Sequence, residues 1–518
     1  MNLSLKKSLS FCALFFLFCF LTSIYLPLII YGGIITDDWG DIAHNLGCTG
    51  FWHCYQTWFP LFSNRPLAPL PITLSTFLFG THMMGYLIAN SFIYLLAIFI
   101  TAKVILEINS LSSAIIFATI AAIPCIAMPL LTSPINQLTA TISFLYWAIS
   151  LYSLLQYCKK ENFNYYIASY LFLLLGFLTY EVILPLLVLT IFLPTLVPNK
   201  LHQFKLVSYA RKFLLPVVLI IISIILWQKI IAPQFMAVDS RLKFDAGQAL
   251  NKLHTWFHVF YAQLPRLFAK SFGFISSLHL ISCVLVTLTF LFSVALQVKN
   301  NFHRRNSLFF VICLGCFLAS SAIFILSNES AVSWGYQARG LSSTWFSLAL
   351  LLASISTLIT LQRAIIKVIG MSAIAGITCL STLVFLVQRD NYIASWQLQK
   401  IIIEDALGLI ENSTLPFGSE IIANVPKFTP NNFNGELVFS QSWDFPAALA
   451  IYSYGRVVGG TVIDSRSNNW NGFKFDGKVA SINDGWKSSS ADLWFYDFDQ
   501  KTQKGTLLKI EDHGHFIK

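Results

Sequence analysis

Charged residues are scarce in this chain. Among its 518 residues are 34 Lys and Arg and 24 Asp and Glu, 11% of the chain, while 56% of residues are hydrophobic and 15% aromatic. Soluble globular domains carry about 25% charged residues. Apolar stretches of about 20 residues also recur, the length that crosses a bilayer as a helix. These features exclude a water-soluble fold and predict an all-α polytopic membrane protein.

Several catalytic signatures are also missing. The sequence has no phosphate-cradling glycine loop, no Gly-x-Ser-x-Gly elbow and no His-Glu-x-x-His pair, which argues against nucleotide hydrolysis and zinc-dependent membrane proteolysis. The net charge of +10 is spread in small clusters between apolar segments. Nucleic-acid binding, which needs a concentrated basic surface, is therefore not indicated.

Hydropathy predicts eleven membrane spans. The first follows Lys6 and Lys7 and is too long for a signal peptide, so we expect it to be retained. The fifth and sixth are separated only by Tyr180-Glu181, with Pro185 shortly after. The predicted spans are residues 8–31, 83–101, 111–131, 135–157, 165–179, 182–197, 213–231, 274–298, 307–327, 341–361 and 365–387.

The charges between the spans predict an orientation. With the amino terminus in the cytoplasm, the cytoplasmic segments hold 14 basic residues and only two acids, Glu107 and Glu161. Such an excess of Lys and Arg marks the cytoplasmic side. The loops at 32–82 and 232–272 then face the periplasm of a bacterial inner membrane. The second contains Trp256 beside basic residues and predicts a helix lying in the interface.

Residues 1–388 form the predicted transmembrane module, and the polar residues 389–518 form a predicted periplasmic α/β domain. We expect a helix over 392–410 and strands at 420–425, 456–463 and 492–498. The tail also carries three tryptophans. They are candidates for glycan contact, although buried core positions are expected for at least two of them: Trp443, Trp470 and Trp494.

Cysteine usage agrees with an outward-facing first loop. Eight of the ten cysteines lie in or beside spans, where thiols behave as small apolar groups. The other two, Cys48 and Cys54, are candidates for a disulfide. Zinc binding by these cysteines with His44 and His53 is the alternative, but their spacing matches no standard zinc site.

The loop at 32–82 holds the most informative polar cluster. It opens with Thr36-Asp37-Asp38-Trp39 and ends with Ser63-Asn64-Arg65-Pro66. Desolvation at the hydrocarbon edge raises the pKa of a carboxyl group and makes its carboxylate a better base. The acidic pair predicts acid–base chemistry. The alternative is a solvated turn in which an Asp caps an interfacial helix.

The acidic pair Asp37-Asp38 after the first span, the Trp-rich loop ending in Asn64-Arg65-Pro66-Leu67, and about eleven spans with an outside carboxy-terminal domain resemble GT-C glycosyltransferases. The resemblance is greatest to bacterial O-antigen glucosyltransferase-like proteins of lipopolysaccharide synthesis. It is weaker to protein O-mannosyltransferases and lipid A aminoarabinose transferases. It implies a polyprenyl-phosphate sugar donor, a glycan or lipid acceptor in the cell envelope, and a catalytic base at Asp38 with Asp37 as its partner.

Transfer from a sugar phosphate also needs cations for the leaving phosphate. The candidates on the periplasmic side are Arg65, Arg339, Arg241 and Lys243, of which the first two are favoured. The alternative for each arginine is snorkelling to lipid headgroups. Glu181 is an acid at membrane depth, which predicts either a role in orienting the acceptor or an ion pair with an arginine.

Other functions stay open at this level. A lipid-linked sugar flippase or other transporter would show internal repeats and ionisable groups at the bilayer midplane, and neither is visible. An O-antigen polymerase or ligase also acts on lipid-linked sugars outside the cytoplasm. A cofactor is not predicted with certainty, because an acidic pair can hold a divalent cation as readily as a proton.

Overall fold

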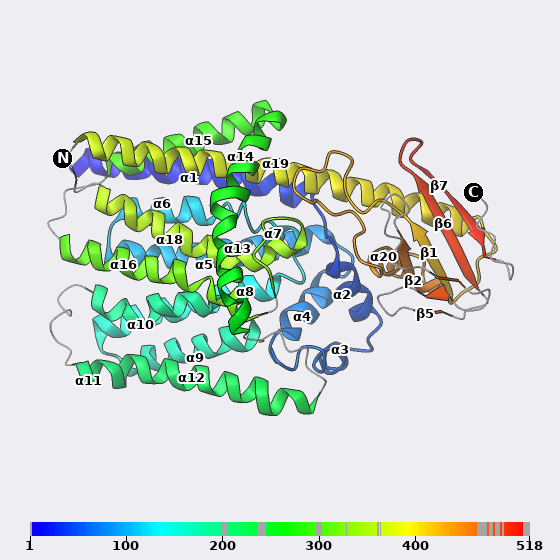
Figure 1. The fold of residues 1–518 in the computed structure, drawn as a ribbon, viewed down its shortest axis with the longest axis horizontal. Coiled ribbons are helices and arrows are strands. Elements are labelled where there is room, and N and C mark those ends of the chain that lie inside the picture. The colour runs from blue at the N-terminus through cyan, green and yellow to red at the C-terminus, as the bar shows by residue number, and fades with distance from the viewer. Residues whose placement is uncertain are drawn as a thin grey trace.

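The computed structural model shows a helical bundle joined to a small α/β unit (Figure 1). It describes residues 3–197, 206–235, 245–296, 303–327, 329–359, 362, 364–463, 474–475, 480–481, 487–488 and 492–510.

Within these described residues, eight helical segments are long and apolar enough to span a membrane, and they coincide with eight of the eleven predicted spans. The polytopic all-α prediction is therefore confirmed. The main helices of these segments are α1 (Leu3–Tyr31), α5 (Met83–Ile108), α8 (Leu138–Lys160), α12 (Leu215–Leu226), α15 (Ser277–Ala295), α16 (His303–Ala319), α18 (Ser342–Ile359) and α19 (Ala364–Glu411).

The other three predicted spans are occupied by shorter apolar helices. Helix α6 (Leu111–Ala121) ends early because Pro124 and Pro129 follow, and a proline has no amide to continue a helix. Helix α9 (Phe163–Thr179) ends just before Glu181, where a 3₁₀ turn leads into α10 (Leu187–Leu196). The break predicted between the fifth and sixth spans is therefore present.

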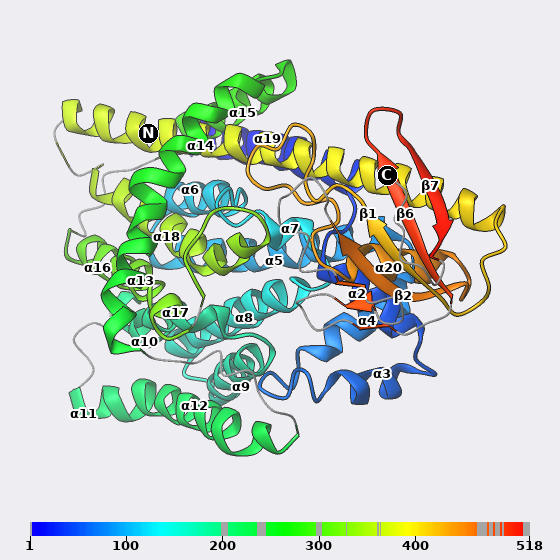
Figure 2. The same cartoon turned by 45° about the vertical axis from the view of Figure 1, so that its right-hand side comes forward.

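The segment between α12 and α15 crosses the bundle instead of running along it. Helices α13 (Ala246–His258) and α14 (Leu264–Ser271) lie across the long helices in Figures 1 and 2. Trp256 of α13 is fully buried, its ring centroid is 4.9 Å from that of Phe317, and its Nε1 donates to Thr344 Oγ1. This tryptophan therefore attaches the crossing helix to α16 and α18.

The C-terminal α/β unit, the described residues from 412 to 510, contains a four-stranded sheet. Its strand order is β2-β1-β6-β7, with β1 parallel to β2 and β6, and β7 antiparallel to β6. The three predicted strands are confirmed within one residue, whereas β7 and helix α20 were not predicted. The elements are β1 (Ser419–Asn424), α20 (Asp444–Tyr452), β2 (Val457–Ile463), β6 (Leu493–Asp499) and β7 (Lys504–Lys509), with short strands β3 (Lys474–Phe475), β4 (Ala480–Ser481) and β5 (Lys487–Ser488).

Helix α19 connects the bundle to this unit without a break. One hydrophobic core contains residues of the first loop, of α19 and of the unit, including Trp39, Trp396 and Phe445. Gly33 is required there, because a Cβ at this position would lie 2.0 Å from the Trp396 ring. The boundary proposed at residue 388 falls inside α19 and stays a prediction.

A buried arginine supplies a hydrogen-bond donor that α1 lacks. Pro27 has no amide, so the Ser23 carbonyl lacks its usual helical donor. Arg389 of α19 is 2% exposed, and its Nη1 donates to Ser23 O at 2.8 Å. Its Nε and Nη2 donate to Asp390 Oδ1, and Asp390 Oδ2 is 2.8 Å from His279 Nε2 of α15. This network joins three helices.

Replacing Arg389 by Met is expected to destabilise the protein by about 2–4 kcal/mol, because a buried carbonyl and a carboxylate lose their donor. The measurement is the thermal unfolding midpoint of the purified full-length protein in detergent. Arg211→Met, at an exposed position, is the matched control. Equal midpoints for the two variants would show that the network does not stabilise the fold.

Candidate active site

Helix α2 (Asp37–Leu46) carries the acidic pair in its first turn. The partial positive charge of a helix N-terminus favours acids there. The helix places Asp37, Asp41 and His44 on one face, because residues at i, i+4 and i+7 lie above one another. Asp38 is turned by about 100° to another face. The two adjacent acids therefore have different surroundings.

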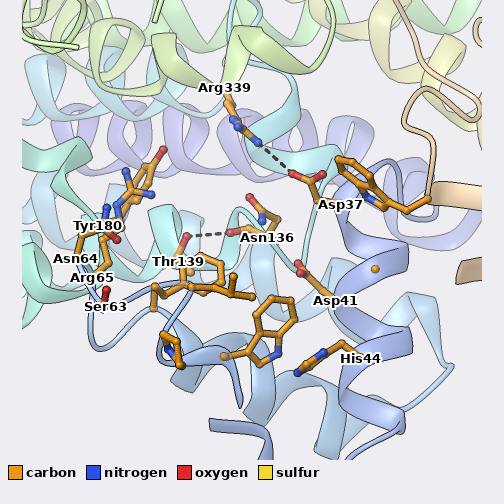
Figure 3. Close-up of a pocket in the computed structure, with 17 residues that line it drawn as sticks. Asp37, Asp41, His44, Ser63, Asn64, Arg65, Asn136, Thr139, Tyr180 and Arg339 are labelled. Carbon is orange, nitrogen blue, oxygen red and sulfur yellow. Dashed lines mark hydrogen bonds and ion pairs between the residues drawn. The ribbon is translucent and has the colours of Figure 1, made fainter. Parts of the chain in front are cut away.

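The face of Asp37 lines a cavity of about 550 Å³. Figure 3 shows Arg339 next to Asp37 at one end, Arg65 and Tyr180 at a second side, and Asp41 and His44 away from Arg65. The wall consists of Asp37, Gly40, Asp41, His44, Trp58, Pro60, Leu61, Phe62, Ser63, Asn64, Arg65, Ala68, Asn136, Thr139, Tyr180, Arg339 and Trp443.

Asp38 is fully buried and does not belong to this lining. Its Oδ1 accepts hydrogen bonds from Ser133 Oγ and from the backbone amide of Asn136, both at 2.9 Å. Its Oδ2 has no hydrogen-bond partner among the described residues. Burial raises the pKa of Asp38 to about 7. Asp38 fastens α2 to the loop before α8 and does not face the cavity.

Asp37 keeps 28% of its side chain exposed and faces the cavity. Its Oδ2 lies 3.4 Å from Arg339 Nη1, on the turn that leads into α18. The Arg339 guanidinium stacks on the Tyr336 ring, 4.0 Å from the ring centroid. Two of the residues singled out in the sequence, 302 positions apart, therefore lie side by side.

Arg65 and Glu181 form a bidentate ion pair. Arg65 Nε donates to Glu181 Oε2 at 2.6 Å, and Arg65 Nη2 donates to Oε1. The Arg65 guanidinium also lies 4.1 Å from the centroid of the Tyr180 ring. Arg65, Tyr180 and Arg339 separate the main cavity from a smaller one that Glu181 also lines. Glu181 was expected either to orient the acceptor or to pair with an arginine, and the structure contains the ion pair.

Asp41 had no role assigned from the sequence, and Trp443 was a candidate for glycan contact; both line the cavity. Asp41 is 4% exposed, and its Oδ2 has no hydrogen-bond partner among the described residues. Burial, with smaller effects from Asp38 and Asp37, raises the pKa of Asp41 well above its usual value. Its spacing of four from Asp37 is the signal that could have identified it. Trp443 comes from the C-terminal α/β unit and is 47% exposed.

The remaining candidates lie elsewhere. Cys48 and Cys54 form a disulfide with Cα atoms 5.4 Å apart. Arg241, Lys243 and Trp470 lie outside the described residues, and Trp494 is buried. Within the part of the chain that the structure describes, no group of three or more His, Cys, Asp or Glu is arranged to hold a metal ion.

The raised pKa of Asp38 predicts that the stability of the fold depends on pH. Its pKa is raised in the folded state, so the folded protein binds more protons than the unfolded chain between about pH 4 and 7. Its contribution to the unfolding free energy therefore falls as pH rises through this range. Asp38→Asn, which keeps the Oδ1 acceptor, is expected to flatten the dependence of the thermal midpoint between pH 5 and 8. An unchanged slope would contradict the burial of a titrating Asp38.

The Arg65–Glu181 pair can be tested by a double-mutant cycle. Glu181→Met leaves the buried Arg65 without its counter-charge and is expected to cost about 1–3 kcal/mol. Adding Arg65→Met to Glu181→Met is expected to recover at least half of that loss. Thermal midpoints of the wild type, Arg65→Met, Glu181→Met and the double variant give the coupling energy, and additive single effects would show that the two side chains do not interact.

Comparisons with known proteins do not assign this chain to a family. No family model and no curated protein matches the sequence. Two solved structures of ArnT from Cupriavidus metallidurans are similar, one bound to undecaprenyl phosphate and one in the apo state. Each is 13% identical, with 96% of this chain and 97% of that chain covered, and the TM-scores are 0.37 and 0.39. A likeness this low does not establish a shared fold.

Proposed function

We propose that this protein is a membrane glycosyltransferase that moves a sugar from a polyprenyl-phosphate donor to a hydroxyl group of a cell-envelope glycan or lipid. The observation that carries the proposal is the contact of Asp37 with Arg339 inside the cavity. A carboxylate base and a phosphate-binding cation stand next to each other, which is what transfer from a sugar phosphate requires.

The catalytic base in this proposal is Asp37 and not Asp38, the residue chosen by position in the sequence. A general base must reach the proton that it removes. Asp37 lines the cavity, whereas Asp38 is fully buried and directs Oδ1 at Ser133 and Asn136. Asp38 instead keeps α2 in position, so that Asp37 points toward the substrate.

The proposed reaction is a single displacement. Asp37 takes the proton of the acceptor hydroxyl, and the acceptor oxygen bonds to the anomeric carbon. The bond from that carbon to the phosphate oxygen breaks, and its electron pair leaves with the polyprenyl phosphate. Direct attack inverts the anomeric centre. Arg339 and Arg65 stabilise the charge that grows on the leaving phosphate, since a guanidinium offers several donors to phosphate oxygens.

The location of the cavity suits a lipid-linked donor. Figures 1 and 2 place α2, α3 (Phe51–Trp58) and α4 (Pro69–Phe79) at one end of the bundle, beside the C-terminal α/β unit. A polyprenyl chain can remain in the bilayer while its phosphate reaches Arg339. With the orientation predicted from the charges, this end faces the periplasm of a bacterial inner membrane.

The test compares Asp37→Asn with Asp38→Asn in a strain that lacks the gene. Mass spectrometry of envelope glycans and lipids would report a hexose-sized increment restored by the wild-type gene. Asp37→Asn is expected to lower the modified fraction at least 100-fold, because general-base catalysis contributes about 10²–10⁴. Asp38→Asn retains the Oδ1 acceptor and is expected to keep most activity.

Equal membrane insertion of both variants is the control. Full activity of Asp37→Asn would remove Asp37 as the base. If the deletion changes no glycan or lipid, glycosyl transfer itself is wrong. Accumulation of the lipid-linked donor in the deletion strain, without any loss of a final glycan, would favour transport of that donor instead.

A further inference from the structure

Two indole rings lie on the cavity wall. Trp58 ends α3, and Trp443 stands just before α20 in the C-terminal α/β unit. Trp443 lies against Gly40 of α2, where a Cβ would be 3.5 Å from the Trp443 Cδ1 atom. Gly40 stands between Asp37 and Asp41 in the sequence. The unit therefore brings an aromatic ring close to the proposed base.

Both indoles are held in place. Trp58 Nε1 donates to Asn45 Oδ1 at 2.7 Å, and its ring centroid is 4.3 Å from that of His44. Trp443 is followed by Asp444, a fully buried residue whose Oδ2 accepts from the backbone amides of Ser440 and Gln441 at 2.9 Å each. These contacts fix the backbone that carries Trp443, although 47% of this tryptophan is exposed.

The same part of the wall also carries polar groups that can form hydrogen bonds with a ligand. The Asp41 Oδ2 atom is buried and has no hydrogen-bond partner among the described residues. A buried polar atom left without a partner is unfavourable, so a hydroxyl that bonds to it is bound more tightly. Burial raises the pKa of Asp41 and so favours its neutral form, which can both donate to and accept from such a hydroxyl. Thr139 also lines the cavity; its hydroxyl donates to the Asn136 backbone carbonyl at 2.8 Å, and its oxygen can accept a hydrogen bond from a ligand.

We propose that Asp41, Trp58 and Trp443 form a subsite for a pyranose ring of the acceptor, so that the acceptor is a glycan. This inference rests on the proposed glycosyl transfer. A pyranose has apolar C–H faces that bury against indole rings, and equatorial hydroxyls at its rim that need hydrogen-bond partners. Aromatic surface with a few polar groups is the combination that the wall provides.

The geometry of displacement assigns this subsite to the acceptor rather than to the donor. In an inverting transfer, the incoming oxygen and the leaving phosphate lie on opposite sides of the anomeric carbon. Of the proposed phosphate ligands, Arg65 lies across the cavity from Asp41 (Figure 3), whereas Arg339 contacts Asp37. Asp37 precedes Asp41 by one helical turn. An acceptor bound beside Asp41 therefore reaches Asp37 from the side away from Arg65, which leaves the space between Arg65 and Arg339 for the phosphate.

The test measures binding apart from turnover. Envelope polysaccharide purified from the deletion strain is titrated onto full-length protein in nanodiscs, and undecaprenyl phosphate is titrated separately. Trp443→Ala and Asp41→Asn are expected to weaken polysaccharide binding about 5- to 10-fold and to leave undecaprenyl phosphate binding unchanged. Trp443→Phe, which keeps an aromatic face, is expected to recover most of the binding.

Two controls separate this inference from the proposed function. Trp52→Ala, on α3 but outside the cavity lining and 67% exposed, is expected to bind as the wild type does. Asp37→Asn is expected to bind polysaccharide while failing to modify it.

Unchanged polysaccharide binding by Trp443→Ala and Asp41→Asn, or no binding by the wild type, overturns the subsite. Weakened undecaprenyl phosphate binding would assign the indoles to the donor and also overturns it. Loss of glycan modification by Asp37→Asn still supports the transfer reaction in each of these cases.

Discussion

The burial of one face of α2 is the constraint on which the site depends. Asp38 accepts two hydrogen bonds from the loop before α8, and Trp39 Nε1 donates to Gln399 Oε1 of α19 at 2.8 Å. Trp39 also stacks on Trp396, with ring centroids 5.8 Å apart. These contacts fix the rotation of α2 about its axis. Since a helix has 3.6 residues per turn, fixing this face directs Asp37 and Asp41 at the cavity.

Burying Asp38 costs free energy, since a carboxylate loses its hydration. Part of that cost is avoided because the raised pKa lets the group stay protonated near neutral pH. Asp37 keeps contact with the cavity and with the positive charge of Arg339. One adjacent pair of acids thus contains a buried group that holds the helix and a half-buried carboxylate that faces the cavity. The two roles require opposite environments and could not be exchanged without turning the helix.

The sequence predicted local features better than the wall of the cavity. Apolar length located the long helices, and alternation located β1, β2 and β6 within one residue. The acidic pair lies on a helix that lines the cavity, but which acid faces the cavity depends on the rotation of α2, which contacts with Gln399 and Asn136 determine. Trp443 is about 400 residues from Asp37, and no local pattern predicts that they share a cavity. The early end of α6 was missed, because hydropathy windows weigh apolar content above the effect of Pro124.

The two arginines of the cavity are not equivalent as phosphate ligands. Arg65 uses Nε and Nη2 on Glu181 and is 7% exposed, so its position is fixed and much of its hydrogen-bonding capacity is occupied. Arg339 stacks on the Tyr336 ring, has one 3.4 Å contact with Asp37 and keeps 26% of its side chain exposed. Its guanidinium can bond to a phosphate without breaking a bidentate pair. In the proposed transfer, Arg339 therefore binds the leaving phosphate directly, while Arg65 contributes mainly a fixed positive charge and a rigid wall. Because the same Arg339 also contacts the base, arrival of the phosphate would release Asp37 to accept the proton.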